Sequence, residues 1–154
     1  MVSNLAHRPH FEGFDNCILS KLKEAVPNLH IEKWDVGFRE ILSASSIFVC
    51  DHYSTTFLEA FCLNHPTIVF WNSEHYLLND SAKPYYDMLI DAKILFYNPE
   101  VVAKSLVSAY QDVEVWWNKP LIQQAVKTFC NQFAKTFQNA VKIWDNELAH
   151  ILEA

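Results

Sequence analysis

The sequence predicts an α/β fold in which a parallel sheet is flanked by helices, and three features of the chain support this prediction. Short apolar runs alternate along the chain with segments that place apolar residues at helical spacing. The runs at 47–50 and 67–71 are apolar almost throughout, which is typical of strands covered on both faces. An apolar stripe over residues 120–152 predicts a long C-terminal helix.

Each expected element has a local reason. Apolar residues three or four positions apart indicate the helices, and the alternating segment 29–34 suits a half-buried strand. Asn98 followed by Pro99 indicates a helix start, because Asn caps a helix and Pro suits its first position. In chain order we expect helix 15–26, strand 29–34, helix 36–44, strand 47–50, helix 56–63, strand 67–71, helix 85–92, strand 94–97, helix 99–110 and helix 120–152.

This alternation implies a Rossmann-like, mainly parallel sheet with helices on both faces. At 154 residues, and without a linker-like segment, the chain is expected to form one domain over residues 1–154. A stripe as long as 120–152 should extend past the core of such a domain. We therefore expect its uncovered part to meet a missing domain, a partner chain or a second copy.

Composition excludes several classes of protein. The chain is 51% hydrophobic and 14% aromatic, so it is not disordered. Its net charge is −6 and it has no cluster of Lys and Arg, which argues against a nucleic-acid partner. Met1 is not followed by a basic segment and an apolar stretch, and no apolar run approaches the roughly 20 residues of a membrane span. We expect neither a secretory leader nor a transmembrane segment.

The number and spacing of the glycine, cysteine and histidine residues exclude several kinds of binding site. With Gly13 and Gly37 as its two glycines, the chain can hold neither a GxGxxG fingerprint nor a P-loop. No cysteines have CxxC spacing, and we expect all four to be buried, reduced thiols of a cytosolic protein. No H-x-x-x-H or C-x-x-C pair occurs, and His7 and His10 alone are a weak indication of a metal site, so we predict no metal and no cofactor.

The segment that gives the clearest indication of a binding site follows the strand expected at 47–50. That strand ends at Asp51, and a loop carrying Ser54, Thr55 and Thr56 leads into a helix. Backbone N–H groups at a helix start attract anions, and ligands of open α/β sheets lie beyond the carboxyl ends of strands. The segment thus indicates a phosphate-bearing ligand, above all a nucleotide. The alternative is a purely structural cap, since Thr56 and Glu59 have capping-box spacing.

Two further side chains are candidates for contacts to this ligand. Arg8 could hold phosphate with its guanidinium fork, although it lies near a terminus that is frayed by default. His52 lies inside the loop and could contact phosphate or act in acid–base chemistry, although a loop histidine is more often a plain polar contact. We identify no catalytic residue.

Two other groups of residues are open to a binding and a structural interpretation. The segment after the strand at 67–71 could line a base or sugar pocket or form an ordinary surface loop. Its candidates are Glu74, His75, Tyr76 and Asn79. Trp116 and Trp117 could stack on a ligand, but beside a long amphipathic helix we expect them to pack that helix against the body.

Several strings in the chain resemble a known group of proteins. They are Asp51 to Ala60 (DHYSTTFLEA), Asn64 to Trp71 (NHPTIVFW), Lys83 to Asp87 (KPYYD), Ala92 to Leu95 (AKIL), Trp116-Trp117 and Phe129 to Ala134 (FCNQFA). Together they resemble the C-terminal half of GT-B glycosyltransferase-like bacterial transferases of surface-polysaccharide synthesis. The glycerophosphotransferases of teichoic-acid synthesis are similar in placing Asp-x-x-Ser before a helix and Pro-Ile-x-Phe after it. The resemblance covers about residues 38–145.

This resemblance implies a GT-B C-terminal-type domain that binds a nucleotide-activated sugar or related donor. Ser54, Thr55 and Thr56 would bind the diphosphate, Glu59 would bind the ribose hydroxyls, and Asp51 would hold the loop. It also implies a cytoplasmic protein, with a peripheral position at the inner membrane as a further option. GT-B enzymes hold the acceptor on an N-terminal domain for which this chain has no room. The resemblance thus implies an enzyme that is incomplete alone, whereas the alternative is a non-catalytic α/β interaction module.

Overall fold

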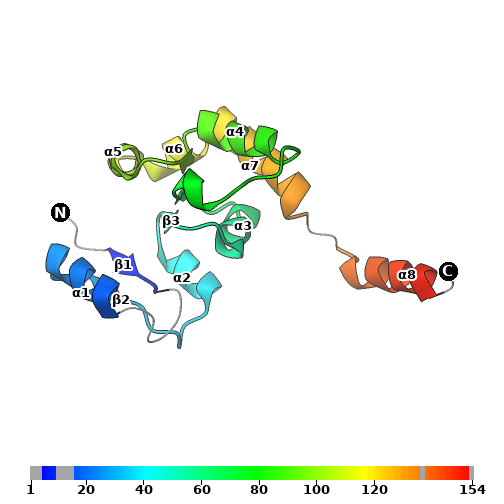
Figure 1. Ribbon diagram of the computed structural model, residues 1–154, viewed down its shortest axis with the longest axis horizontal. Helices are drawn as coiled ribbons and strands as arrows, with labels where there is room; N and C mark the ends of the chain where they lie inside the picture. Colours follow the sequence, from blue (N-terminus) through cyan, green and yellow to red (C-terminus); the bar gives the residue numbers. More distant parts are fainter. Residues whose placement is uncertain (1–4, 10–15, 136–137, 153–154) are drawn as a thin grey trace. The chain divides into compact units, whose positions relative to one another are not determined.

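A computed structural model describes residues 5–9, 16–135 and 138–152 of the chain (Figure 1). The chain divides into two compact units, one up to Ser45 and the other from Ser46 onward, and each is described by itself. Within the described residues, no helix combines the length and apolar character needed to cross a membrane.

The residues of the first unit that the structure describes form two short parallel strands and two helices. Ala6 pairs with His30 and His7 pairs with Ile31. The expected strand at 29–34 is thus much shorter, and residue 15 of the first expected helix lies outside the described residues. The elements are β1 (Ala6–His7), α1 (Asn16–Ala25), β2 (His30–Ile31) and α2 (Phe38–Ala44).

The second unit contains the parallel sheet that the sequence predicts. Its strand order is β3-β4-β5, with Val49 opposite Ile68 and Val69 opposite Leu95, and both pairs of strands are parallel. The elements are β3 (Phe48–Cys50), α3 (Thr55–Cys62), β4 (Thr67–Phe70), the 3-10 turn η1 (Ser73–His75), α4 (Lys83–Asp91), β5 (Leu95–Phe96), α5 (Pro99–Ala109), α6 (Val113–Trp117), α7 (Pro120–Phe133) and α8 (Ala140–Leu152).

Helices cover both faces of this sheet, because successive residues of β4 point to opposite faces. Val69 belongs to a large buried cluster with residues of α3, α4 and α7, and α4 packs beside α7 (Figure 1). Ile68 belongs to a smaller cluster with Val102 and Ala109 of α5. The α/β fold with a parallel sheet flanked by helices is therefore confirmed, and burial on both faces explains why β4 is apolar.

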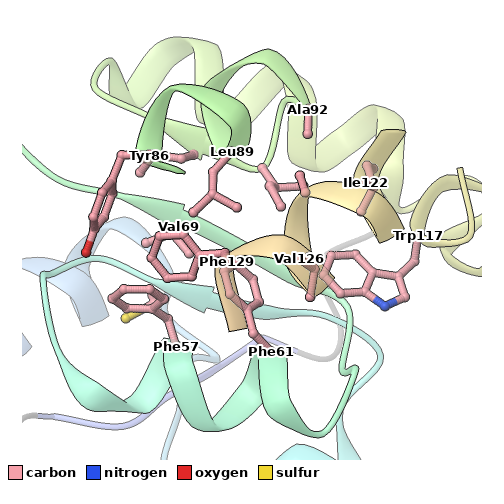
Figure 2. Packing of buried hydrophobic residues seen from close by; sticks show 14 of the residues in the cluster. Phe57, Phe61, Val69, Tyr86, Leu89, Ala92, Trp117, Ile122, Val126 and Phe129 are labelled. Atoms are coloured by element: carbon pink, nitrogen blue, oxygen red, sulfur yellow. The ribbon is translucent and has the colours of Figure 1, made fainter. Parts of the chain in front are cut away.

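Aromatic rings fill much of the larger cluster (Figure 2). Phe129 of α7 is fully buried and makes edge contacts with Phe61 of α3 and Tyr86 of α4. Trp117 is also buried, and its indole N–H donates to the backbone carbonyl of Asn64 at 2.9 Å. The expected packing role of Trp117 is confirmed, although it lies in the helix α6 rather than in an irregular connection.

Two helices that lead into strands end in the same way. After α3, Asn64 adopts a left-handed φ of 51° and its N–H donates to Phe61, while the next N–H donates to Ala60. After α4, Lys93 has a φ of 59° and the same two bonds recur with Ile90 and Leu89. These are Schellman motifs, and both use a non-glycine residue at the left-handed position.

The C-terminal stripe does not form the single helix that the sequence predicts over residues 120–152. Helix α7 ends at Phe133, and a separate helix α8 begins at Ala140. The side chains of α7 that face the cluster hold it in place, whereas α8 contributes no buried residue. Spacing fixes which residues share a face but not whether the helix continues, and continuation depends on a surface to pack against.

Candidate functional site

The loop between β3 and α3 lies at the carboxyl edge of the sheet, as the sequence predicts. Ser54 is the N-cap of α3, and its Oγ accepts a hydrogen bond from the N–H of Thr56 at 3.3 Å. The expected capping box of Thr56 and Glu59 is therefore wrong, because the helix begins one residue earlier, at Thr55. A side chain at the first or second helical position cannot act as the cap, which must lie outside the helix.

Two of the three loop hydroxyls point toward the protein rather than toward a ligand. The Oγ of Ser54 and the Oγ1 of Thr56 lie 2.6 Å apart, and the Sγ of Cys50 lies 3.7 Å and 3.6 Å from them. Burial raises the pKa of the Cys50 thiol above its ordinary value, in spite of these hydrogen bonds. This cluster joins the end of β3 to the first turn of α3 and fixes the shape of the loop.

Thr55 and Glu59 have exposed side chains. Thr55 is the first residue of α3, so its hydroxyl and the N–H groups of the first turn lie at the positive end of the helix dipole. Glu59 lies one turn further along the same helix. Of the three hydroxyl residues that the sequence singles out, Thr55 is the one best placed to meet a ligand.

Asp51 and His52 form a pair at the start of the loop. The Oδ1 of Asp51 lies 2.8 Å from the Nδ1 of His52, and both side chains are largely open to solvent. This contact helps to fix the orientation of the imidazole. Asp51 therefore acts on its neighbouring side chain, and no bond from its carboxylate to the loop backbone is observed among the described residues.

Arg8 follows β1 directly in the first unit. Its guanidinium lies over the ring of Trp34, with 4.2 Å between Cζ and the ring centroid. Its Nη1 is buried and has no hydrogen-bond partner among the described residues. A buried donor without a partner is uncommon in folded proteins, and a guanidinium can bind an anion such as phosphate. The expectation of a frayed terminus is not met at Arg8, since the stacked ring holds its side chain.

Sequence reasoning missed a group of aromatic side chains at the same sheet edge. Tyr53 lies in the loop after β3, Trp71 follows β4, and Tyr97 follows β5. The ring centroids of Tyr53 and Trp71 are 5.6 Å apart in an edge arrangement, and those of Trp71 and Tyr97 are 6.2 Å apart. The available signal was an aromatic residue within three positions of each strand end.

The residues expected to line a base or sugar pocket differ in how far their side chains are exposed. Glu74 and His75 belong to η1 and are exposed, and the Oδ1 of Asn79 accepts bonds from Ser81. Tyr76 is half-buried, and its ring lies 5.7 Å from that of Tyr53. Tyr76 is thus the member of this group that joins the aromatic side chains.

Comparison with known proteins identifies the family. A family model described as "LIC12162 family transferase" matches residues 1–148. The chain belongs to the LIC12162 transferase family. No curated protein and no solved structure matches the chain.

Membership of the LIC12162 family supports a transferase-like function. A transferase must bind a group donor and stabilise its leaving group, and the strand-end loop with Thr55 offers N–H groups and a hydroxyl for that task. No group of His, Cys, Asp or Glu suited to hold a metal ion occurs within the described residues. The family match thus supports a transferase-like function and does not identify the group donor.

The cysteines whose side chains the structure describes differ in burial, and Cys50 at the end of β3 is buried. Cys62 is exposed and Cys130 is half-buried, which corrects the expectation that all cysteines are buried. Both line a cavity of about 400 Å³ between α3 and α7. Burial, and then the neighbouring Cys62, raises the pKa of Cys130 to about 12, so that thiol is a poor nucleophile at neutral pH.

Proposed function

We propose that this chain is the donor-binding part of a GT-B-like glycosyltransferase that uses a nucleotide-activated sugar or a related donor in surface-polysaccharide synthesis. The observation that carries the proposal is the start of α3 at the carboxyl end of β3, with the exposed Thr55 in its first position. Membership of a transferase family and the resemblance of the segment 51–60 add to it.

In this proposal the first turn of α3 binds the diphosphate. An α-helix leaves its first N–H groups without partners inside the helix, and Ser54 takes one of them. The remaining N–H groups and the Thr55 hydroxyl receive the phosphate oxygens and stabilise the leaving diphosphate as negative charge develops. Glu59 binds the ribose hydroxyls, and His52, held by Asp51, donates to a phosphate oxygen.

Arg8 is proposed as a phosphate contact. Its buried, unpartnered Nη1 and its stacking on Trp34 support this role. Lys cannot reproduce the planar fork, so Arg8→Lys should weaken binding of a nucleoside diphosphate even though the charge is kept. An unchanged dissociation constant in that variant would show that Arg8 does not contact phosphate.

The acceptor is proposed to come from another domain or partner chain, as in the proteins that the sequence resembles. We therefore expect binding of donor by residues 1–154 without transfer of its sugar to an acceptor. Such chemistry depends mostly on positioning the two substrates, which needs both halves of the site. Sugar transfer to a polysaccharide acceptor by this chain alone would contradict the incomplete-enzyme part of the proposal.

Calorimetric titration with UDP and CDP tests the donor site. Thr55→Ala and Glu59→Gln should each weaken binding by several-fold, because each removes one or two hydrogen bonds worth about 1 kcal/mol. Ser108→Ala removes an exposed hydroxyl and Glu114→Gln neutralises an exposed carboxylate elsewhere on the unit, and both serve as controls. Equal affinity in all four variants would show that α3 does not hold the donor.

A non-catalytic interaction module is the second candidate function. The exposed apolar residues of α8, such as Trp144 and Leu148, favour it. The same titration separates the two candidates, since an interaction module has no reason to bind a nucleoside diphosphate.

A further inference from the structure

The aromatic side chains at the carboxyl edge of the β3-β4-β5 sheet form two layers. The lower layer is core, since Trp71 is 4% exposed and Tyr86 is 3% exposed. The upper layer faces solvent, since Tyr53 is 46% exposed and Tyr97 is 40% exposed. An exposed ring that rests on buried rings is held in place and yet remains partly open to solvent.

Contacts within the group hold Tyr53 in particular. Its ring lies 5.6 Å from Trp71, 5.7 Å from Tyr76 and 6.1 Å from Tyr86. The hydroxyl of Tyr86 donates to the hydroxyl of Tyr53 at 3.1 Å. Figure 2 shows Tyr86 at the margin of the core cluster, where its phenol oxygen points away from Phe129. Tyr53 is therefore pre-organised, and binding to its face costs little conformational entropy.

This aromatic group adjoins the start of α3. Tyr53 directly precedes the cap residue Ser54, and its ring also lies 6.2 Å from Phe57 in the first turn of the helix. A ligand whose phosphates lie at Thr55 would thus have the aromatic side chains beside it. The side chains of Tyr53, Tyr76, Tyr97 and Trp71 carry no charge at neutral pH, so the net charge of −6 does not prevent a neutral ring from binding to them.

We propose that Tyr53, Tyr76 and Tyr97, seated on Trp71, form a stacking surface for the heteroaromatic base of a nucleotide. The proposal rests on the proposed function for the position of the phosphates. A sugar ring needs hydrogen-bonding partners around its rim, whereas the Tyr53 hydroxyl already accepts from Tyr86 and the group offers mainly ring faces. Stacking of a base on such faces tolerates any base, so purines and pyrimidines should both bind.

Calorimetry with UDP, ADP and inorganic pyrophosphate tests the surface on the full chain. Tyr53→Leu should weaken UDP and ADP binding about fivefold or more and leave pyrophosphate binding unchanged, because only the base is lost from the contact. Tyr53→Phe keeps the ring and should stay within about twofold of the parent chain. Tyr110→Leu replaces an exposed tyrosine at the end of α5 and should change nothing.

The outcomes separate this inference from the proposed function. Pyrophosphate binding with equal UDP affinity in the parent chain and Tyr53→Leu would overturn the stacking surface and leave the phosphate site intact. A Tyr53 effect on UDP without any pyrophosphate binding would support stacking and remove the phosphate site from α3. Absence of binding by all three probes would overturn both.

A measurement on the parent chain covers the case in which Tyr53→Leu fails to fold. In saturation-transfer NMR with UDP and with uridine, the base protons should receive more saturation than the ribose protons. Equal or weaker saturation of the base would overturn the proposal. Tyr97→Leu, at the end of β5, provides a second variant with the same expected direction.

Discussion

The hydroxyls of Ser54 and Thr56 lie 2.6 Å apart, and both lie near the thiol of Cys50. Ser54 also caps α3 by accepting from the N–H of Thr56. Two of the three loop hydroxyls thus stabilise the loop itself, which leaves Thr55 for a ligand. If the proposed function is right, stability and donor binding depend on neighbouring residues, and mutation can separate them.

Ser54→Ala should lower the free energy of unfolding by about 1 kcal/mol, because the cap and its hydrogen bond are lost. Thr55→Ala should change stability much less, since its side chain is exposed and accepts no described hydrogen bond. Urea denaturation followed by circular dichroism measures both. Equal destabilisation by the two variants would show that Ser54 is not the cap.

The left-handed residues Asn64 and Lys93 give a matched pair. Lys93→Gly should raise the free energy of unfolding by about 0.5–1 kcal/mol, because glycine adopts a positive φ without strain. Asn64→Gly gains less, since the Oδ1 of Asn64 also lies 3.1 Å from the indole nitrogen of Trp117. Thermal melts of both glycine variants and of Lys93→Ala rank their stabilities. Lys93→Ala serves as the control, because alanine does not relieve the strain of a positive φ. A destabilised Lys93→Gly would contradict the assignment of φ.

Alkaline pH should destabilise the second unit through Cys50. Burial holds the pKa of this thiol above its ordinary value of 9.0, so the folded chain keeps the proton that the unfolded chain releases. Stability is therefore fully present below pH 9.0 and falls as pH rises through the folded pKa. One such group gives a slope of at most about 1.4 kcal/mol per pH unit.

Urea denaturation at a series of pH values above neutrality, under reducing conditions, measures this slope. Cys50→Ala should make this slope less steep without removing it, because burial also raises the pKa of Cys130. Val69→Ala, which shortens another buried side chain of the same cluster, should lower stability at every pH without changing the slope. The same slope in the Cys50 variant as in the parent chain would assign the effect to other groups.

Helix α8 should mediate self-association. Val141, Trp144, Leu148 and Ile151 are exposed and follow the alternating spacing of three and four that pairs helices in coiled coils. A helix of 13 residues is marginal alone in water, so a covering surface is expected. Light scattering during size-exclusion chromatography should show concentration-dependent dimers.

Two variants of α8 sharpen this test. Trp144→Glu should abolish the dimer, and Asn146→Glu adds the same charge two positions away as the control. If the chain is monomeric at every concentration, the prediction of self-association is wrong. The apolar stripe of α8 would then be covered by another domain or by the chain itself.

Much of the second unit could be predicted from local sequence. Side-chain spacing within a few residues predicts the apolar runs that form β3 and β4. Local sequence also predicts the helix cap at Asn98 and the helices that alternate with the strands. The loop at the end of β3 could likewise be located, because a polar segment after a buried strand has few other places to lie.

The sequence by itself determined the α/β alternation, the parallel sheet and the position of the candidate loop, since each depends on local patterns of burial and turn chemistry. Only the tertiary structure decided which hydroxyls face inward, where the stripe at 120–152 breaks, and that Tyr53, Trp71 and Tyr97 meet. These features depend on contacts between residues far apart in the chain. Spacing along one segment carries no information about such contacts, because they form only when the strands align.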